Sequence, residues 1–211
     1  MYLPLIHRGD RLHALVLGGG AVAKRKVYDL LEAHAELHVI SPYWDSELEA
    51  LLDDKAIPHE TRGYQSGDIE GHNLVIVATD DESVNRAAFE EARRLGVPVN
   101  VVDQPELCTV YFAAVVRSDP LLLAISTGGA APFFARELKH AAVEWLEGGW
   151  TLRAKWAELI RRFALDNLDG MDARERLFQR FMRMEVEHLE TWDFDHPPAQ
   201  LWESWSREEE E

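Results

Sequence analysis

The sequence predicts an α/β protein in which a parallel sheet covered by helices is followed by a small α+β unit and an all-helical C-terminal part. Three observations support this. Short apolar runs alternate with helix-like stretches over residues 1–112, the pattern of a parallel sheet with helices on both faces. Two further apolar runs and one helix occupy residues 113–150. Residues 151–211 contain helical patterns and no strand-like run.

Within residues 1–112, the first two apolar strands and the amphipathic helix between them set the pattern that the rest of the region repeats. The apolar stripe of residues 21–34 recurs at helical spacing, and Gly96 supplies a helix stop. The expected strands are 12–17, 36–40, 57–61, 73–78 and 97–102, and the expected helices are 21–34, 45–54 and 82–95.

The region 113–150 changes pattern. The expected strands 109–116 and 121–126 are joined by a turn-like tetrad at 117–120. A helix over 132–147 follows, with Pro132 at its first position and two glycines at its end. A strand–strand–helix unit of this size cannot bury a core alone, so we expect it to be a dimerisation domain that packs on its copy in a homodimer.

The region 151–211 is expected to form a helical domain with an acidic tail. Two amphipathic helices are predicted over 151–167 and 172–190, separated by Asp169-Gly170. The glutamate run at 208–211 is interpreted as a solvated, frayed end.

Composition limits the functions that the chain can have. The 211 residues are 46% hydrophobic and 28% charged, so a buried core is expected. The net charge of -16 argues against nucleic-acid binding, which needs a basic face. No apolar run reaches the roughly 18 residues that span a bilayer, and the N-terminus has no signal-peptide pattern, so we expect a cytoplasmic protein without membrane association. The single cysteine, Cys108, excludes an internal disulfide framework.

The loop after the first strand carries the clearest chemical signal. Gly18-Gly19-Gly20-Ala21-Val22-Ala23 stands between a strand and a helix and fits G-x-G-x-x-A, the pattern of a Rossmann-like dinucleotide domain. Gly18 allows the tight turn, Gly20 lets a pyrophosphate approach the backbone, and Ala23 lets the helix lie close to the sheet. The phosphates would bind at the helix N-terminus. The predicted cofactor-binding residues here are Gly18, Gly20, Ala21, Val22 and Ala23, and the alternative is a purely structural glycine turn.

The acidic residue that usually holds the ribose, about 20 residues beyond the last glycine, is missing. The first acid in this region is Asp45. Ser41 and the backbone of Pro42 and Tyr43 are therefore the candidates for binding the ribose. No arginine lies nearby to receive a 2'-phosphate, which favours NAD over NADP.

A second rim of the predicted cofactor crevice follows the strand at 73–78. Thr79 and Asp80 come directly after this strand, and loops at strand C-termini line the crevice in this architecture. We therefore expect both residues to contact the cofactor. The alternative is that Asp80 or Asp81 only caps the helix that starts at residue 82.

Four motifs occur together in order. They are Gly18-Gly19-Gly20-x-Val22-Ala23-x-Arg25-Lys26, Ala78-Thr79-Asp80-Asp81 with Asn85, Asn100-Val101-Val102-Asp103, and Ser126-Thr127-Gly128-Gly129 with Pro132 and Ala135-Arg136. With these motifs the sequence resembles the precorrin-2 dehydrogenase / sirohydrochlorin ferrochelatase family, the non-methyltransferase part of siroheme synthase. With 211 residues, we expect the methyltransferase domain of the long fused enzymes to be absent.

The resemblance implies a homodimeric enzyme that uses NAD to oxidise precorrin-2 to sirohydrochlorin. In bifunctional members, ferrous iron is then inserted to give siroheme. The resemblance also implies that Asp103 is the functional acid and that Thr127 lies near the substrate pocket. Two alternatives stay open: a dehydrogenase without chelatase activity, and a non-catalytic NAD-sensing module.

The position of Asp103 fits a catalytic role. It directly follows the apolar strand at 97–102, so we expect it at the mouth of the crevice. A carboxylate there can act as a general base or accept pyrrole protons during metal insertion. The alternative is a strand-end aspartate that caps a turn before Pro105.

A tetrapyrrole with several carboxylates needs local donors on an acidic protein. The candidates for substrate binding are Thr127, the backbone amides of Gly128 and Gly129, and the side chains of Arg117, Arg136 and Lys139. Arg136 and Lys139 lie three residues apart and share a helix face. The alternative for each side chain is a solvent-facing cation. The sequence shows no metal-ligand cluster, and Cys108 is interpreted as a packed residue.

Overall fold

The computed structural model describes residues 2–194, so the expected acidic tail lies outside the described residues. The described residues form two compact units, 2–112 and 113–194. Within residues 2–194, every helix is too short or too polar to cross a bilayer. The expectation of a parallel α/β sheet followed by a helical region is confirmed.

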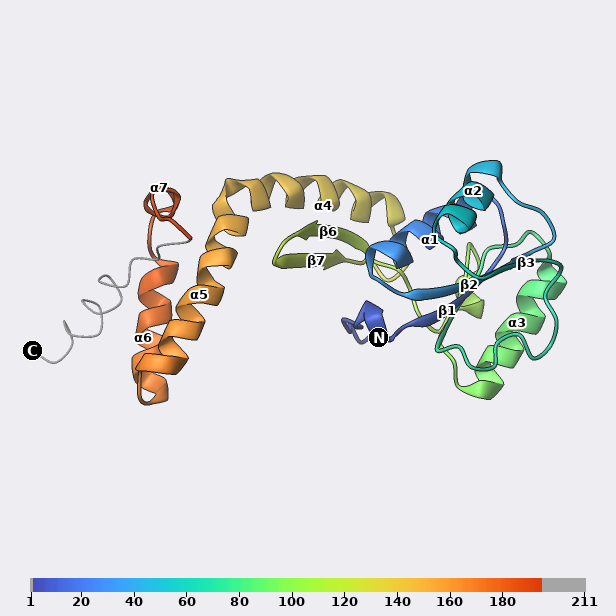
Figure 1. Ribbon diagram of the computed structural model, residues 1–211, viewed down its shortest axis with the longest axis horizontal. Coiled ribbons are helices and arrows are strands. Elements are labelled where there is room, and N and C mark those ends of the chain that lie inside the picture. Colours follow the sequence, from blue (N-terminus) through green and yellow to red (C-terminus); the bar gives the residue numbers. More distant parts are fainter. Residues whose placement is uncertain (1, 195–211) are drawn as a thin grey trace, which may run out of the picture. The chain divides into compact units, whose positions relative to one another are not determined.

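The first unit is a five-stranded parallel sheet in the order β3-β2-β1-β4-β5. Its strands are β1 (His13–Leu17), β2 (Glu36–Ser41), β3 (His59–Thr61), β4 (Leu74–Val77) and β5 (Val99–Val101), and its helices are α1 (Ala21–Glu32), α2 (Ser46–Asp54) and α3 (Glu82–Leu95). Figure 1 shows α1 and α2 on one face of the sheet and α3 on the other.

Alternate residues of the central strands serve two separate cores. In β1, Ala14 and Val16 pack under α1 and α2, whereas Leu15 and Leu17 pack under α3. All four side chains are 0–1% exposed. Burial on both faces explains why these strands read as continuous apolar runs rather than as alternating patterns.

The expected strand at 109–116 begins only at residue 114, because its first residues are held along the end of β5. The amides of Thr109 and Val110 both donate to the carbonyl of Val99, over 2.8 and 3.2 Å. The side-chain amide of Asn100 donates to the carbonyl of Val110 over 3.0 Å. This segment, together with the short turn η2 (Pro105–Leu107), closes the β5 side of the first unit.

The second unit begins with an antiparallel hairpin, β6 (Ala114–Ser118) and β7 (Leu121–Ile125), which packs against α4 (Pro132–Trp145). The turn is shorter than the expected tetrad, because Arg117 and Ser118 are paired with Leu122 and Leu121 within the ladder. After α4 the chain bends through η3 (Leu146–Trp150), where Gly149 has a φ of 94°.

Three helices complete the described part of the second unit: α5 (Thr151–Asn167), α6 (Met171–Met182) and α7 (Val186–Glu190). Their core contains Trp156, Ile160, Ala164, Leu177, Phe181 and Leu189. The prediction of one helix over 172–190 is wrong, because the helix ends at Met182 and a new one starts at Val186.

A buried arginine accounts for this break. The guanidinium of Arg153 on α5 donates to the carbonyls of Phe181, Met182 and Met184, over 3.0, 3.4 and 2.6 Å. Carbonyls that lose their partners where a helix ends need another donor, and Arg153 supplies it from a distant point of the sequence.

Candidate functional site

The strand order of the first unit places two of the predicted rims side by side. The chain crosses from β1 to β2 on one side, and β4 pairs with β1 on the other, with Leu17 opposite Val77. In such sheets, ligands bind outside the carboxyl ends of the strands at the point where the order reverses. The glycine loop after β1 and the loop after β4 meet at this point.

Glycine is required at positions 18 and 19 because neighbouring loops approach the backbone there too closely for a side chain. A Cβ at Gly18, which has a φ of 125°, would lie 2.2 Å from the carbonyl oxygen of Ala78. A Cβ at Gly19 would lie 2.1 Å from the carbonyl oxygen of Tyr43 and 2.6 Å from the Ser41 hydroxyl. The sequence reasoning gave Gly19 no role, although the run of three glycines could have drawn attention to it.

Gly20 differs from its two neighbours. A Cβ added there would meet no heavy atom of the described residues within 4 Å, so the space above its backbone is open. Gly20 is also the N-cap of α1, and it has no side chain to bind the amides of the first turn. These amides are therefore available to an anion. Ala21 and Val22 are exposed, and Ala23 is fully buried against the sheet.

The loop after β2 is organised by Ser41. Its hydroxyl donates to the carbonyl of Tyr43 over 2.5 Å, and the residue is only 1% exposed. This geometry shows that Ser41 shapes the loop under Gly19, and the contact of Ser41 with a ribose stays a prediction. Pro42 and Tyr43 stand exposed at the rim, Tyr43 to 62%.

The loop after β4 is braced by a buried amide. The hydroxyl of Thr79 donates to Oδ1 of Asn85 over 2.7 Å, and Nδ2 of Asn85 donates to the carbonyl of Thr79 over 3.1 Å. Asp81 caps α3 by accepting the amides of Ser83 and Val84.

The two aspartates of this loop therefore differ. The hydrogen bond from the Ser83 side chain and the capped amides lower the pKa of Asp81. The capping alternative thus applies to Asp81. Asp80 is exposed on the rim, where the sequence predicts a cofactor contact.

Asp103 lies at the same edge of the sheet, at the end of β5. The amide of Val102 donates to the carbonyl of Val77 over 2.9 Å, which places this end beside the loop after β4. Asp103 is exposed and adopts a φ of 60°. Left-handed backbone in a non-glycine residue is uncommon and is often found at functional sites.

The capping alternative for Asp103 is not realised. The N-cap of η2 is Gln104, which makes no side-chain cap. The carboxylate of Asp103 has no hydrogen-bond partner within residues 2–194 that would give it a structural task. The thiol of Cys108 instead holds this loop, donating to the carbonyls of Val101 and Gln104 over 3.1 and 3.3 Å. Burial raises the pKa of Cys108, so it acts as a packed thiol.

The predicted substrate-binding residues all lie in the second unit. Two of them already have partners within the loop before α4. The hydroxyl of Thr127 accepts the amide of Ala131 over 3.0 Å, and the amide of Gly128 donates to the Ser126 hydroxyl over 3.1 Å. The Gly128 amide is thus engaged within its own loop, whereas Gly129 is exposed, and substrate binding by both stays a prediction.

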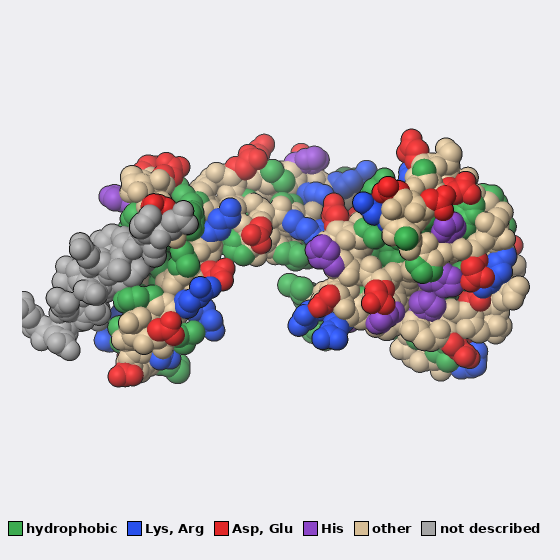
Figure 2. All heavy atoms as spheres, in the orientation of Figure 1, with side chains coloured by type: hydrophobic (Ala, Val, Ile, Leu, Met, Phe, Trp, Pro, Cys, Tyr) green, Lys and Arg blue, Asp and Glu red, His purple; other side chains and the backbone are tan. Residues whose placement is uncertain are grey.

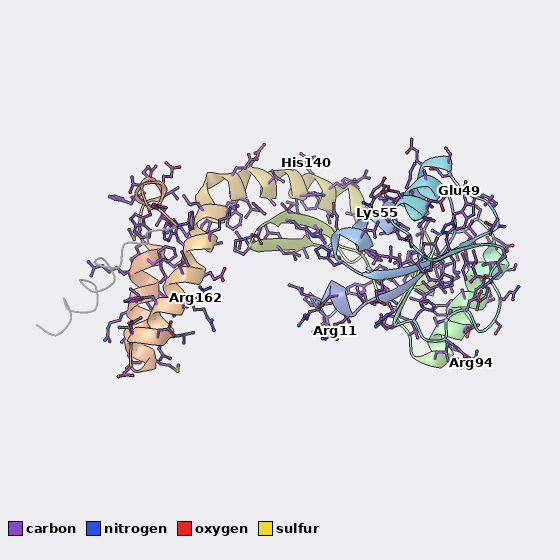
Figure 3. The ribbon with its side chains drawn as sticks, in the orientation of Figure 1. Arg11, Glu49, Lys55, Arg94, His140 and Arg162 are labelled. Atoms are coloured by element: carbon purple, nitrogen blue, oxygen red, sulfur yellow. The ribbon has the colours of Figure 1, made fainter. Side chains whose placement is uncertain are left out.

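The predicted cations of the second unit are also exposed. Arg136 and Lys139 lie on α4, and Arg117 lies on β6. His140 marks the side of α4 that is turned away from the hairpin (Figure 3). Across residues 2–194, no three histidine, cysteine, aspartate or glutamate side chains are grouped as metal ligands.

Comparison with known proteins adds three findings. The family model described as "Putative NAD(P)-binding" matches residues 5–114. A siroheme synthase of Pseudomonas entomophila (strain L48) is 44% identical over 162 residues, which are 77% of this chain and 34% of that protein. A siroheme synthase of Pseudomonas paraeruginosa (strain DSM 24068 / PA7) is 37% identical over 185 residues, which are 88% of this chain and 40% of that protein. The chain thus spans about a third of the length of the curated relatives it matches.

A solved structure titled "SirC, precorrin-2 dehydrogenase" is similar to this chain with a TM-score of 0.69 and 19% sequence identity. The match covers 91% of this chain and 100% of that one. The likeness shows that the two proteins share a fold across both units.

Proposed function

Because this chain belongs to the NAD(P)-binding family whose model covers residues 5–114, we propose that it is an NAD-dependent dehydrogenase that oxidises precorrin-2 to sirohydrochlorin in siroheme biosynthesis. The observation that carries the proposal is the open backbone at Gly20, at the edge of the sheet where β1, β4 and β5 end. This edge combines uncapped amides in the first turn of α1 with a carboxylate at Asp103 that has no structural task. The siroheme synthases at 44% and 37% identity support the choice of a tetrapyrrole substrate.

The residues of the chain fit a dinucleotide. The backbone of Gly20 leaves the space that a diphosphate needs, and the first turn of α1 offers amides to its oxygens. Pro42 and Tyr43 form one rim, and Thr79 and Asp80 form the other. When bound, NAD⁺ supplies the hydride acceptor of the reaction.

Asp103 accounts for the proton that leaves the substrate. Removing a hydride and a proton together oxidises the reduced macrocycle, so a base must stand where the substrate ring meets the crevice. The Asp103 carboxylate is exposed and lies on a residue with left-handed backbone at the end of β5. We infer that it accepts this proton as a general base.

Substitution of Asp103 tests the proposal. Asp103→Asn keeps a residue that tolerates positive φ but removes the base, so turnover of precorrin-2 with NAD⁺ should fall by about 10²–10⁴-fold while NAD⁺ still binds. Asp103→Ala should lose turnover equally. The measurement is the absorbance change from precorrin-2 to sirohydrochlorin. If both variants turn over at the wild-type rate, Asp103 has no catalytic role. If the wild-type protein itself forms no sirohydrochlorin, the proposed function is refuted.

A second activity is favoured by the name of the relatives, because a siroheme synthase makes an iron-containing product. We infer that ferrous iron is a further substrate, with Asp103 accepting the two displaced pyrrole protons one after the other and releasing each to solvent. The test compares metal insertion into sirohydrochlorin with and without protein, using Fe²⁺ and Co²⁺. Equal rates of metal insertion in both samples would show that the protein is a dehydrogenase without chelatase activity. A protein that binds NAD⁺ but no tetrapyrrole is instead a sensing module.

We also propose that the active form is a homodimer built on the second unit. Large apolar side chains of α4 and β7 are exposed in the single chain: Phe133 to 70%, Phe134 to 50%, Leu122 to 40% and Leu138 to 39%. Figure 2 shows hydrophobic side chains at the surface of this region. A monomer seldom leaves so many large apolar side chains of one segment in water, and a second copy offers a matching face.

A further inference from the structure

A charged cluster stands directly beside the glycine loop. Lys24 is the fourth residue of α1, Asp45 is the N-cap of α2, and Glu47 lies in the first turn of α2. The Lys24 ammonium donates to Oδ1 of Asp45 over 3.0 Å and to Oε2 of Glu47 over 2.8 Å. The side chains of Lys24 and Asp45 are 20% and 30% exposed, so both are partly shielded, whereas that of Glu47 is 79% exposed.

The cluster is tied to the coenzyme crevice by the backbone. The amide of Asp45 donates to the carbonyl of Gly19 over 2.7 Å. In this architecture, the segment after β2 faces the ribose that carries either a 2'-hydroxyl or a 2'-phosphate. The hydroxyl of Ser41, at the end of β2, is buried and occupied within its own loop. Asp45 is the first charged residue after β2, and Lys24 links it to Glu47 through hydrogen bonds to both carboxylates.

The charges of the cluster oppose a second phosphate. A lysine beside the ribose would by itself attract a 2'-phosphate, since an ammonium is a common phosphate ligand. Here two carboxylates accept hydrogen bonds from that ammonium and leave the three groups with a net charge of about -1 at neutral pH.

The hydrogen bonds of the cluster shift the pKa values of Lys24 and Asp45. The hydrogen bonds to Glu47 and Asp45 raise the pKa of Lys24. The hydrogen bond from Lys24 and the capped amides of Leu48 and Glu47 lower the pKa of Asp45. At neutral pH the ammonium is therefore charged and engaged, and the Asp45 carboxylate is ionised.

We propose that the Lys24–Asp45–Glu47 cluster selects NAD over NADP. Its two carboxylates bind the Lys24 ammonium, which would otherwise be able to bind the 2'-phosphate of NADP. The proposal rests on the proposed coenzyme function and assigns the selectivity of that site to three residues. The carboxylates repel the 2'-phosphate and occupy two of the three donors of the Lys24 ammonium, whereas a ribose with a 2'-hydroxyl meets no such repulsion.

Neutralising the carboxylates tests the selectivity. Calorimetric titration gives the Kd of NADP⁺ divided by the Kd of NAD⁺, which should be well above one in the wild-type protein. In Asp45→Asn/Glu47→Gln, this ratio should fall by about tenfold, as expected when two charges within a few ångströms of a phosphate are removed. Asparagine caps a helix as well as aspartate does, so α2 should stay folded. Glu47→Gln alone, which alters no cap, should lower the ratio by about threefold.

Two further variants isolate the role of the cluster. Adding Lys24→Gln to the double variant removes the freed ammonium, so the NADP⁺ affinity gained should be lost again. Asp53→Asn/Asp54→Asn changes the net charge equally at the far end of the same helix, and the ratio should change there by less than about twofold.

The outcomes separate this inference from the proposed function. The inference is overturned if the Kd ratio is unchanged in the double variant or changes equally in the distal control. If the wild-type protein still binds NAD⁺, the proposed function is unaffected by that result. If the wild-type protein binds neither coenzyme, both are overturned.

Discussion

The first unit and the hairpin–α4 segment of the second unit differ in the burial of their apolar side chains. In the first unit, both faces of the sheet are closed by helices, and the side chains of β4 are all buried. In residues 114–145, only Val116 and Ala135 are buried among the apolar residues, and two phenylalanines of α4 are at least half exposed. An apolar pattern in the sequence predicts that a segment will be buried. The structure then shows whether other residues of the same chain cover that segment.

The helices after residue 150 resemble the first unit in this respect. They close a core of their own around Trp156, which is 0% exposed and meets the ring of Trp192 edge-on at 5.0 Å. The chain therefore has self-sufficient cores on both sides of a segment that lacks one. The following predictions test this contrast, from the largest expected effect to the smallest.

The largest effect is expected from Trp156→Ala. Truncating a fully buried tryptophan costs about 3–5 kcal/mol of unfolding free energy. Because the first unit has its own cores, only the unfolding transition of the helical region should shift. Calorimetric scanning reports the transitions, and Trp145→Ala, at a tryptophan that is 49% exposed, is the matched control. A single transition that shifts as a whole would show that the cores are not independent.

A smaller loss is expected from Gly18→Ala in the other core region. The new methyl group would meet the backbone of Ala78 at 2.2 Å, and the φ of 125° is unfavourable for alanine. We expect a loss of about 2–3 kcal/mol, confined to the first unit. Urea unfolding followed by circular dichroism measures it. Gly20→Ala, where the Cβ meets open space, should cost less than about 1 kcal/mol; equal losses in the two variants would contradict the account.

The exposed face of α4 is tested by Phe134→Asp. A charge in the proposed dimer interface should raise the dimer dissociation constant by about tenfold or more, which corresponds to about 1.4 kcal/mol. Sedimentation at several concentrations measures it. Glu137→Gln on the same helix is the control and should change the constant little. A wild-type protein that remains monomeric at high concentration would remove the interface and leave the exposed apolar face unexplained.

The smallest effect concerns His72 in the first unit. Burial, helped by the stacked His38 ring 5.6 Å away, lowers the pKa of His72. The unfolded chain therefore takes up the proton first, so stability should be full above about pH 6.5 and decline as the pH falls toward the lowered pKa. The slope cannot exceed about 1.4 kcal/mol per pH unit for one proton. His72→Gln should flatten the dependence of the urea midpoint between pH 6.5 and 5; an unchanged slope contradicts this assignment.

The sequence predicted the sheet well, because its strands are buried on both faces and read as unbroken apolar runs. It also placed the glycine loop and Asp103 at strand ends, since strand–turn–helix order is visible in the sequence. It did not predict the roles of Gly19 and Ser41, which depend on a loop from β2 passing over the glycine turn. Such contacts join residues more than twenty positions apart, and local pattern does not encode them.

The helical region shows the same limit. The amphipathic pattern continues from α6 into α7, so periodicity alone predicted one helix. The break depends on Arg153, whose guanidinium reaches carbonyls about thirty residues further along. The lysine cluster was missed for the related reason that Lys24 and Asp45 are brought together only by the packing of α1 beside α2. The division of the second unit at residue 150 stays a prediction.

The claim on which the account depends is that the open backbone at Gly20 receives the diphosphate of a nicotinamide coenzyme. Gly20 has a φ of -91°, which valine adopts without strain, so Gly20→Val fills the crevice without disturbing the fold. Calorimetric titration with NAD⁺ should give a saturable isotherm for the wild-type protein and no measurable binding for a folded Gly20→Val variant. Absence of binding by the wild-type protein, or equal binding by both proteins, would contradict the account.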